Sequence, residues 1–263
     1  MTVAIKVLKQ EVSNLRRSRW ILVYGLLLVA LSDALLRFGG GGPRSVISLL
    51  NVVLILVPLV SLVFGTMYLY AAREFIELLL AQPVGRAALF LGLYGGLAVP
   101  LIVVFVLGVG LPFLWSAGPG ENVAAPLGLL LLSGALLTAT FTAIAFLISL
   151  IFDDRAKGLG VAILLWLGAT AVYDALLVLV VTTFGDYSLE RPLIGLTLLN
   201  PVDLGRVLLL LQADKAALMG YTGAVFERFF GSVVGVAVAG LALMGWTAVP
   251  FALGLLRFRA KDF

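Results

Sequence analysis

Two acidic residues lie inside long apolar stretches of the chain. Asp33 is followed by Arg37 one helical turn later, whereas Asp174 follows Tyr173 and has no basic residue nearby in the sequence. Ionisable residues in such stretches commonly line ion pathways or pair with a partner. Asp33 fits a paired anchor better than a functional site, because Arg37 is within reach. Asp174 fits a functional or a structural role equally well, and we expect it to face a bundle interior or a water-filled vestibule.

Other reactive residue types are absent or scattered. The chain has no Cys and no His, and its four Met residues are far apart: Met1, Met67, Met219 and Met244. Disulfides, thiolate or imidazole metal sites and nucleophile–His pairs are therefore excluded. A G-x-x-x-x-G-K-[ST] phosphate loop and a G-x-S-x-G turn are also absent from the sequence. We expect no catalytic residue, no metal site and no cofactor in this chain.

The segment 72–86 combines acidic and apolar residues between two apolar stretches. As a short helix ended by Pro83, it would present two distinct faces. One face holds Glu74, Glu77 and Leu78, and the other holds Phe75, Leu79 and Gln82. An ordinary connecting loop would be polar and rich in Gly or Ser. The segment therefore predicts an amphipathic rod along a membrane surface, which either docks a partner or anchors at the interface.

A second local pattern reads Asn200-Pro201-Val202-Asp203, with Arg206 following. Asn at an N-cap, Pro in the first turn and a following acid are typical of a helix start. The run 204–211 then offers an apolar face, and 221–230 could form a second short helix. Both are too short to span a membrane and suit helices that lie at, or dip into, an outer interface.

Six apolar runs must position these residues. The chain has 263 residues, of which 62% are hydrophobic and 12% are charged, about half the usual 25% charged fraction of a soluble domain. A membrane-spanning helix needs roughly 20 apolar residues. The runs lie near 20–36, 46–71, 87–115, 125–152, 159–184 and 232–256. We expect an all-α polytopic membrane protein with a single transmembrane domain over 1–263.

The basic residues indicate the orientation of the spans. Twelve of the 18 Lys and Arg residues fall in 1–19, 72–86, 153–158 and the C-terminal tail, and six fall in the alternate connections. The positive-inside bias therefore places both termini in the cytoplasm and 185–231 outside. Segment 1–19 has the pattern of a basic amphipathic interfacial helix, with a solvated leader as the alternative. The net charge of +4 thus indicates contact with the lipid bilayer, with no nucleic-acid partner.

These features together resemble the membrane subunits of ABC-2 type transporters. The resemblance rests on the 72–86 pattern, in which an acid, two leucines and a proline precede a basic residue, and on the six-span layout. It covers nearly the whole chain. The motif Asn200-Pro201-x-Asp203-x-x-Arg206 is similar to that of a narrower group, the NosY-like permeases of the ABC complex that helps to mature nitrous-oxide reductase.

The resemblance implies partners, residue roles and a location. Two copies of the permease would sit on two ATPase subunits, which bind the ATP and Mg, in a bacterial inner membrane. The residues implied to contact the ATPase are Glu74, Glu77, Leu78, Leu79 and Pro83. Those implied for an outer partner or gate are Asn200, Pro201, Asp203 and Arg206. The joint 153–157 is either another ATPase contact or a solvated turn.

Two functions follow from this resemblance. In one, the permease relays ATP-driven motion to a periplasmic copper-binding protein. In the other, it exports a lipid, peptide or small amphipathic compound. Cu(I) prefers sulfur and imidazole ligands, so a copper path through these spans is not expected. An intramembrane enzyme lacks its His residues, and a secondary transporter would show internal repeats and more intramembrane charges.

Overall fold

The apolar runs form helices, because only a helix satisfies all backbone polar groups of a single segment within lipid. The computed structural model describes residues 19–38, 42–116, 124–184, 190–212 and 233–261, and all regular structure in these ranges is helical. The helices are α2 Arg19–Phe38, α3 Gly42–Ala71, α4 Arg73–Leu80, α5 Arg86–Ser116, α6 Ala124–Ile151, α7 Arg155–Leu167, η1 Gly168–Val172, α8 Tyr173–Thr183, α9 Glu190–Leu198, α10 Pro201–Gln212 and α12 Val233–Ala260. The expected helices in 1–18 and 221–230 lie outside the described residues.

The expected membrane spans are confirmed. Six segments of the described chain are long and apolar enough to cross a membrane: α2, α3, α5, α6, α7–η1–α8 and α12. Their ends agree with the sequence prediction within a few residues. The fifth span is continuous from Arg155 to Thr183 but contains the π-helical turn η1 in its middle.

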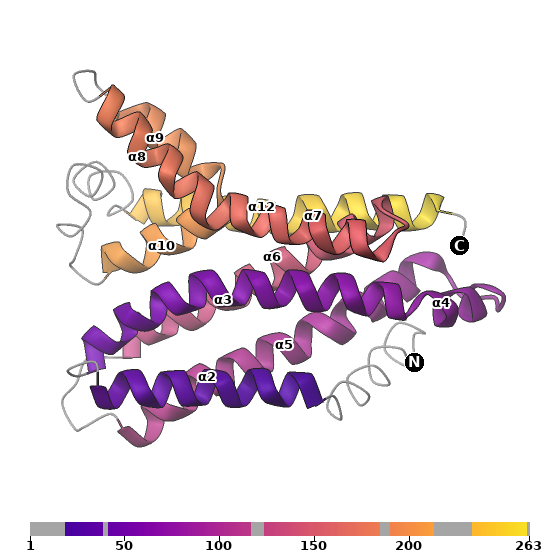
Figure 1. Ribbon diagram of the computed structural model, residues 1–263, viewed down its shortest axis with the longest axis horizontal. Helices are drawn as coiled ribbons and strands as arrows, with labels where there is room; N and C mark the ends of the chain where they lie inside the picture. The colour runs from indigo at the N-terminus through magenta and orange to yellow at the C-terminus, as the bar shows by residue number, and fades with distance from the viewer. Residues whose placement is uncertain (1–18, 39–41, 117–123, 185–189, 213–232, 262–263) are drawn as a thin grey trace.

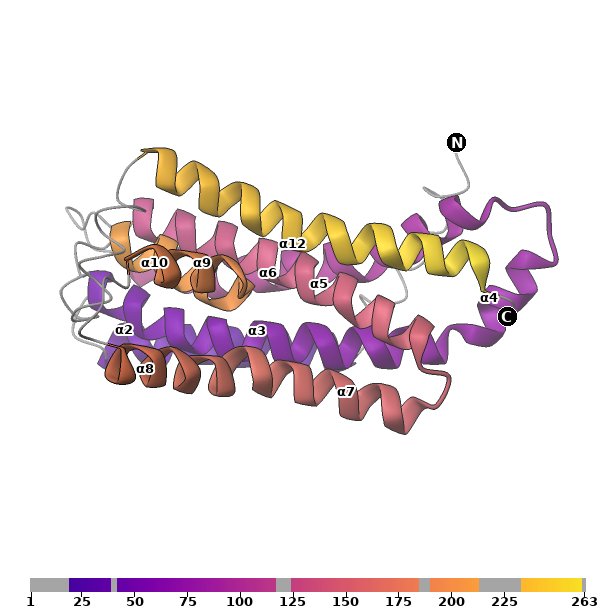
Figure 2. The same ribbon diagram turned by 90° about the horizontal axis from the view of Figure 1, so that it is seen from above.

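Successive spans run in opposite directions, so their connections alternate between two ends of the molecule (Figure 1). At one end α2 begins, α4 joins α3 to α5, α6 passes to α7, and α12 finishes. We call this the α4 end. The opposite end, the α10 end, carries α9 and α10. Figure 2 shows α7 and α8 along one edge of the bundle beside α3, with α12 along the opposite edge.

Helix α6 is the centre of the bundle. It packs against α3, α5 and α12, and 72% of its apolar 18-residue window is buried, compared with 6% for the corresponding window of the span Arg155–Thr183. One of its hydroxyl groups bonds to a neighbouring span: Thr140 Oγ1 lies 2.7 Å from Thr247 Oγ1 of α12. A Cβ added at Gly65 of α3 would lie 2.5 Å from that of Ala145. Glycine is therefore required for this close approach of α3 to α6.

Candidate functional site

Helix α4 presents two different faces, as its sequence predicts. Ile76 is buried and anchors the helix, whereas Glu74, Glu77 and Leu78 are exposed. Leu78 leaves 68% of its surface open, an unusual exposure for a large apolar side chain beside two carboxylates. The three residues form a protruding acidic and apolar surface, which we call the α4 face.

The helix ends before Pro83, as its sequence predicts, and Gln82 lies beyond its last turn. Helix α4 ends at Leu80, and the backbone N–H of Gln82 donates to Leu79 O at 3.1 Å. The reason is that a residue preceding proline avoids helical geometry, so the chain leaves the helix before Pro83. Phe75 and Leu79 pack against the core, and Gln82 and Pro83 are exposed.

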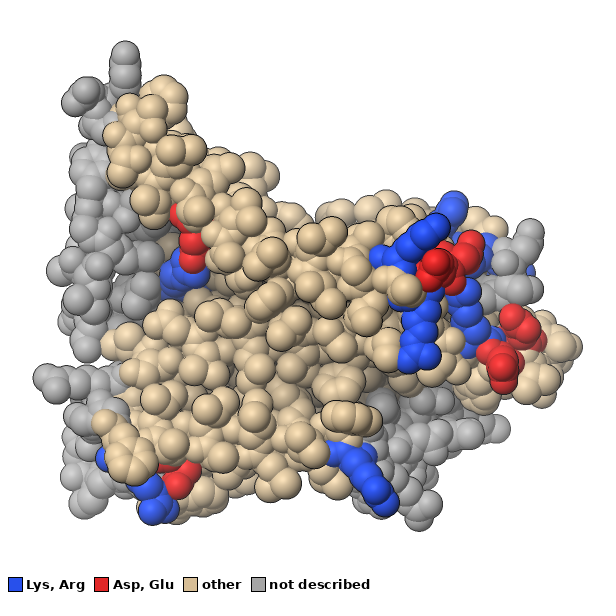
Figure 3. All heavy atoms as spheres, in the orientation of Figure 1, with Lys and Arg blue, Asp and Glu red and all other residues tan. Residues whose placement is uncertain are grey.

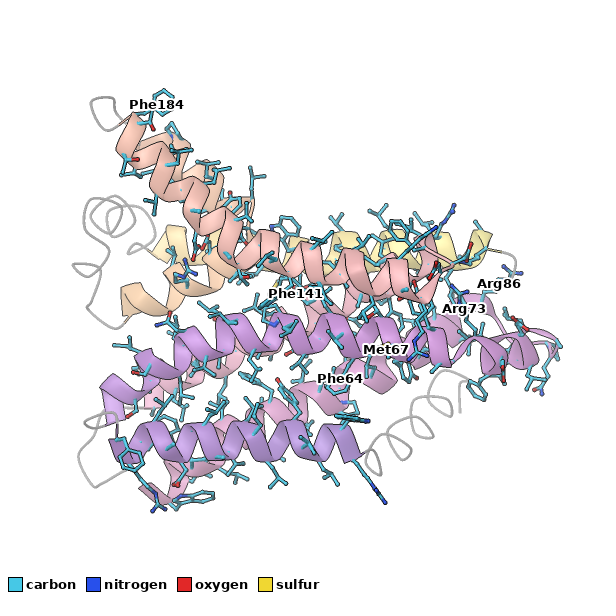
Figure 4. The ribbon with its side chains drawn as sticks, in the orientation of Figure 1. Phe64, Met67, Arg73, Arg86, Phe141 and Phe184 are labelled. Atoms are coloured by element: carbon cyan, nitrogen blue, oxygen red, sulfur yellow. The ribbon has the colours of Figure 1, made fainter. Side chains whose placement is uncertain are left out.

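The start of α4 is tied to the end of α6. Arg73 donates to Ser149 O and Phe152 O, each at 3.4 Å, and its guanidinium lies 4.8 Å from the ring centre of Tyr70. The Tyr70 hydroxyl donates to Phe152 O at 2.8 Å. Cations are favoured at a helix C-terminus, where carbonyl groups lack helical partners. Figure 4 shows Arg73 and Arg86 at this end of the molecule.

The C-terminal tail joins the same cluster. Lys261 Nζ donates to Leu150 O at 2.9 Å and lies 2.6 Å from a carboxylate oxygen of Asp153. The hydrogen bond and charge of Lys261 hold the pKa of Asp153 below its usual range. Arg86 donates to the carbonyls of Arg259 and Lys261 at 2.9 and 2.6 Å. The ends of α6 and α12 and the starts of α4 and α5 therefore meet in one network.

The joint 153–157 is an exposed turn with a defined structure. Asp154 caps α7 by accepting from Ala156 N at 2.8 Å and from Lys157 N at 3.4 Å. Its exposure agrees with the solvated turn expected from the sequence. The pairing of Asp153 with Lys261 was not foreseen, because these residues lie 108 positions apart.

At the α10 end, the predicted outer motif gathers around Asp174. Arg206 binds Asp174 through both oxygens, at 2.7 and 2.9 Å, and lies 3.0 Å from Asp203. Asp174 therefore has a basic partner, supplied by a helix 32 residues later in the chain. The sequence showed only that no partner lies nearby along its own helix. Figure 3 shows a small charged group at this end, separate from the dense charge at the α4 end.

Asn200 connects the motif to the π-helical turn. Its side-chain amide donates to Ala169 O at 2.7 Å, and its oxygen accepts from Val202 N at 3.0 Å. In the widened turn the N–H of Tyr173 reaches back to Gly168 O, and the Tyr173 hydroxyl donates to Leu196 O. The predicted N-cap is thus confirmed, and the same residue fixes α10 against the fifth span. π-helical turns frequently mark functional sites.

The outer motif contains two carboxylates but only one basic group. Asp174 and Asp203 both pair with the guanidinium of Arg206. Asp203 is almost fully buried, with 4% of its side chain exposed. Burial raises the pKa of Asp203, and the neighbouring charge of Asp174 raises it further, while Arg206 opposes both effects. The motif therefore contains a buried carboxyl group whose pKa lies above its usual range.

Helix α10 packs into the bundle, whereas α9 packs against α10. Val202 and Leu204 of α10 are buried, and α10 packs against α3, α6 and α12. Trp246 of α12 donates to Leu198 O, at the end of α9, at 3.0 Å. Of the two placements that the sequence left open for 204–211, the structure favours the one that dips inward, and the helix α9 was not predicted from the sequence.

Two cavities meet at the ion pair. The first, about 310 Å³, lies between α8, α9 and α10 and is lined by Leu177, Val178, Val181, Leu193 and Val207, with Asp174, Asp203 and Arg206 at its polar side. The second, about 330 Å³, lies between α3 and the fifth span and contains Asn51, Trp166 and Thr170. Asp174 and Arg206 line both cavities, so both cavities border this ion pair.

The other intramembrane acid lies elsewhere. Asp33 pairs with Arg37 at 2.8 Å, as expected for a paired anchor, on α2, which packs mainly against α5. Asn51 was not among the residues singled out from the sequence. It is exposed on α3 and lines the second cavity. The sequence could have pointed to Asn51, because an amide side chain inside a long apolar run is uncommon.

Comparisons with known proteins agree with this architecture. Residues 48–263 match the family model described as ABC-2 family transporter protein. The chain is 30% identical to "Probable ABC transporter permease protein NosY" of Pseudomonas aeruginosa, over 99% of each chain. It is 27% identical to the protein of the same name from Stutzerimonas stutzeri, over 97% of each chain. The chain therefore belongs to the ABC-2 family of transporter proteins, as a multi-pass permease subunit of an ABC transporter.

Proposed function

We propose that this permease is a mechanical relay in an ABC complex that matures the copper site of nitrous-oxide reductase. Two copies would stand on two ATPase subunits in a bacterial inner membrane, with both termini and the α4 end in the cytoplasm. ATP and Mg would be bound by the ATPases, and the permease would add no catalytic residue. A periplasmic copper-binding protein would dock at the α10 end.

Near-full-length similarity to two permeases named NosY carries this proposal. The copper role follows from their name together with the composition of this chain. Cu(I) prefers thiolate, thioether and imidazole ligands, and this chain has no Cys, no His and four scattered Met residues. Copper would therefore be held by the partner, and the permease would transmit movement.

The structure supplies a route for such movement. Helix α6 ends among Tyr70 and Arg73 at the α4 end, and its other half packs against α10. Interior packing transmits strain because it is close to solid density. A tilt of α4 would therefore reach α10 through α6, and would act on the ion pair between Arg206 and Asp174.

The α4 face is the proposed ATPase contact. Glu74, Glu77 and Leu78 supply two exposed carboxylates and one exposed leucine, with Leu79 and Pro83 completing the family pattern. Glu77→Arg is expected to lower co-purification of the ATPase subunit at least tenfold, because like charges at a protein interface cost several kcal/mol. The total amount of the permease in the membrane should not change. Arg257→Glu, a charge reversal on α12 at the same end, should retain the ATPase.

A second function is favoured by the first cavity. Its walls are mostly aliphatic and its polar side carries Asp174, Asp203 and Arg206, a lining that suits a lipid, peptide or small amphipathic compound. In this alternative the permease exports such a compound, and no copper-binding partner is needed.

One experiment separates the two functions. The permease would be purified with the products of neighbouring genes, and the bound chains identified by mass spectrometry. An ATPase together with a periplasmic copper-binding protein supports the relay. An ATPase alone, whose hydrolysis is stimulated by an amphipathic compound, supports export. Recovery of the permease with no ATPase contradicts both functions.

A further inference from the structure

Helix α12 carries an apolar stripe that is open along the side of the bundle. Its large side chains are Leu241, Val249, Leu253 and Leu256, which are exposed by 49% to 68%. Their spacing along the sequence places them on one side of the helix. Figure 2 shows α12 along one edge of the bundle. In a membrane this stripe would contact acyl chains, because its surface is apolar.

Two arginines stand at the α4 end of this stripe. Arg257 and Arg259 are exposed and follow Leu256 in the last turn of α12. Because a helix has about 3.6 residues per turn, they project on either side of the line through Leu253 and Leu256. Among the residues that the structure describes, no hydrogen bond or ion pair engages either guanidinium. The stripe therefore ends between two exposed positive charges.

The neighbouring basic residues already have partners. Lys261 and Arg73 lie 2.6 and 3.5 Å from the Asp153 carboxylate. Arg86 donates to the backbone carbonyls of Arg259 and Lys261. Free carbonyls at a helix C-terminus would repel an anion, so this contact removes part of the repulsion at the end of α12. The two exposed guanidiniums are therefore available to an anion from outside the chain.

A groove lies farther along the same stripe. It has a volume of about 360 Å³ and is lined by Leu198, Leu199, Ala242, Gly245, Trp246 and Val249. A Cβ added at Gly245 would meet nothing within 4 Å, and Trp246 joins the two walls by donating to Leu198 O. Gly245 precedes Arg257 by twelve residues, about 18 Å along a helix, and one leaflet contributes about 15 Å of the hydrocarbon core. An acyl chain anchored at the arginines would therefore end in this groove.

We infer that the end of α12 binds an anionic phospholipid of the cytoplasmic leaflet. The phosphate lies between Arg257 and Arg259, and one acyl chain follows the stripe to the groove at Gly245. Guanidinium groups bind phosphate through paired hydrogen bonds, and basic residues beside a span attract anionic lipids. The other candidate occupant is the ATPase, but lipid is favoured because the arginines continue a stripe that is apolar and exposed. The inference goes beyond the relay proposed above and takes from it only the choice of leaflet.

Native mass spectrometry of the purified complex with its ATPase tests this site. The complex would be stripped of lipid in detergent and titrated with phosphatidylglycerol or phosphatidylcholine that carry identical oleoyl chains. A double variant, Arg257→Gln with Arg259→Gln, removes the two charges. The matched control is Arg155→Gln with Lys157→Gln, which removes two exposed charges at the same end of the molecule on α7.

The natural complex should bind phosphatidylglycerol more tightly than phosphatidylcholine, because phosphatidylcholine carries its own ammonium group. The α12 double variant should lose about thirtyfold in affinity for phosphatidylglycerol, or about fivefold for each basic residue. The α7 control should bind phosphatidylglycerol as the natural complex does. Unchanged binding by the α12 variant, or an equal loss in both variants, would overturn the site.

The groove has its own test. Gly245→Leu should weaken the binding of both lipids, because the leucine side chain would occupy the groove. Gly240→Leu is the control, since a Cβ added there also meets nothing within 4 Å and Gly240 does not line the groove. Equal lipid affinity in these two variants would overturn the path of the acyl chain.

Two further outcomes separate this site from the other proposals. Loss of the ATPase from the α12 double variant, with unchanged lipid binding, would assign the arginines to a protein contact and overturn the inference. A complex that lacks a copper-binding protein but binds phosphatidylglycerol through Arg257 and Arg259 would contradict the relay alone.

Discussion

Asn200 offers a sharp test of how the outer motif is held. The side chain caps α10 through Val202 N and donates to Ala169 O in the π-helical turn. Loss of an N-cap costs about 1 kcal/mol, and loss of the hydrogen bond to the half-buried Ala169 carbonyl costs about 0.5–1.5 kcal/mol. Asn200→Ala should therefore lower the free energy of unfolding by roughly 1.5–2.5 kcal/mol, or the midpoint of thermal unfolding by roughly 3–10 °C.

The aspartate variant distinguishes the two contributions. Asn200→Asp keeps an oxygen for the cap but cannot donate to Ala169 O when ionised, and it places a new charge beside Asp203, 3.4 Å from the present amide nitrogen. It should be less stable than Asn200→Ala at pH 8 and recover as the pH is lowered. Unfolding in detergent would be followed by tryptophan fluorescence, with Gln82→Ala, an exposed amide, as the control. An Asn200→Ala variant as stable as the control would refute the assigned contacts.

Two further predictions concern packing and pH. Gly134→Ala should lower the free energy of unfolding by about 1–3 kcal/mol, because the added methyl group would overlap the ring of Phe105. Gly240→Ala, where an added Cβ meets nothing within 4 Å, should instead be neutral or stabilising by up to about 1 kcal/mol; equal melting shifts would contradict this packing. Because the pKa of Asp203 is raised by folding, the folded chain binds more protons than the unfolded chain above the usual aspartate pKa. Stability should therefore fall as the pH rises from about 4, and Asp203→Asn should flatten that dependence in melting curves at pH 5 and 8.

Local patterns were predicted well where one segment contains all the information. The six spans follow from the length of each apolar run, and the pairing of Asp33 with Arg37 follows from their spacing on one helix. The two faces of α4 follow from helical periodicity. Its end before Pro83 follows from the effect of proline on the residues that precede it, and the helix ends at Leu80.

Contacts between distant segments were not predictable in this way. Asp174 was left without a partner because Arg206 lies on another helix, and Lys261 was read only as part of a basic tail. In both cases packing of several helices is needed before the charges meet. Asn51 is conspicuous in the sequence as an amide inside a long apolar run, but the exposure of its side chain follows only from the packing of α3.

The sequence by itself determined that the protein lies in a lipid bilayer and how many times it spans that bilayer. It also determined that an amphipathic helix lies between the second and third spans. These properties depend on composition and periodicity along a single stretch of chain, because apolar residues partition into lipid and polar residues into water. The tertiary structure decided that α10 packs into the bundle, that Arg206 binds Asp174, and that Lys261 closes the network at the α4 end. Those choices depend on which helices pack together, because an ion pair forms only when packing brings its two charges within reach.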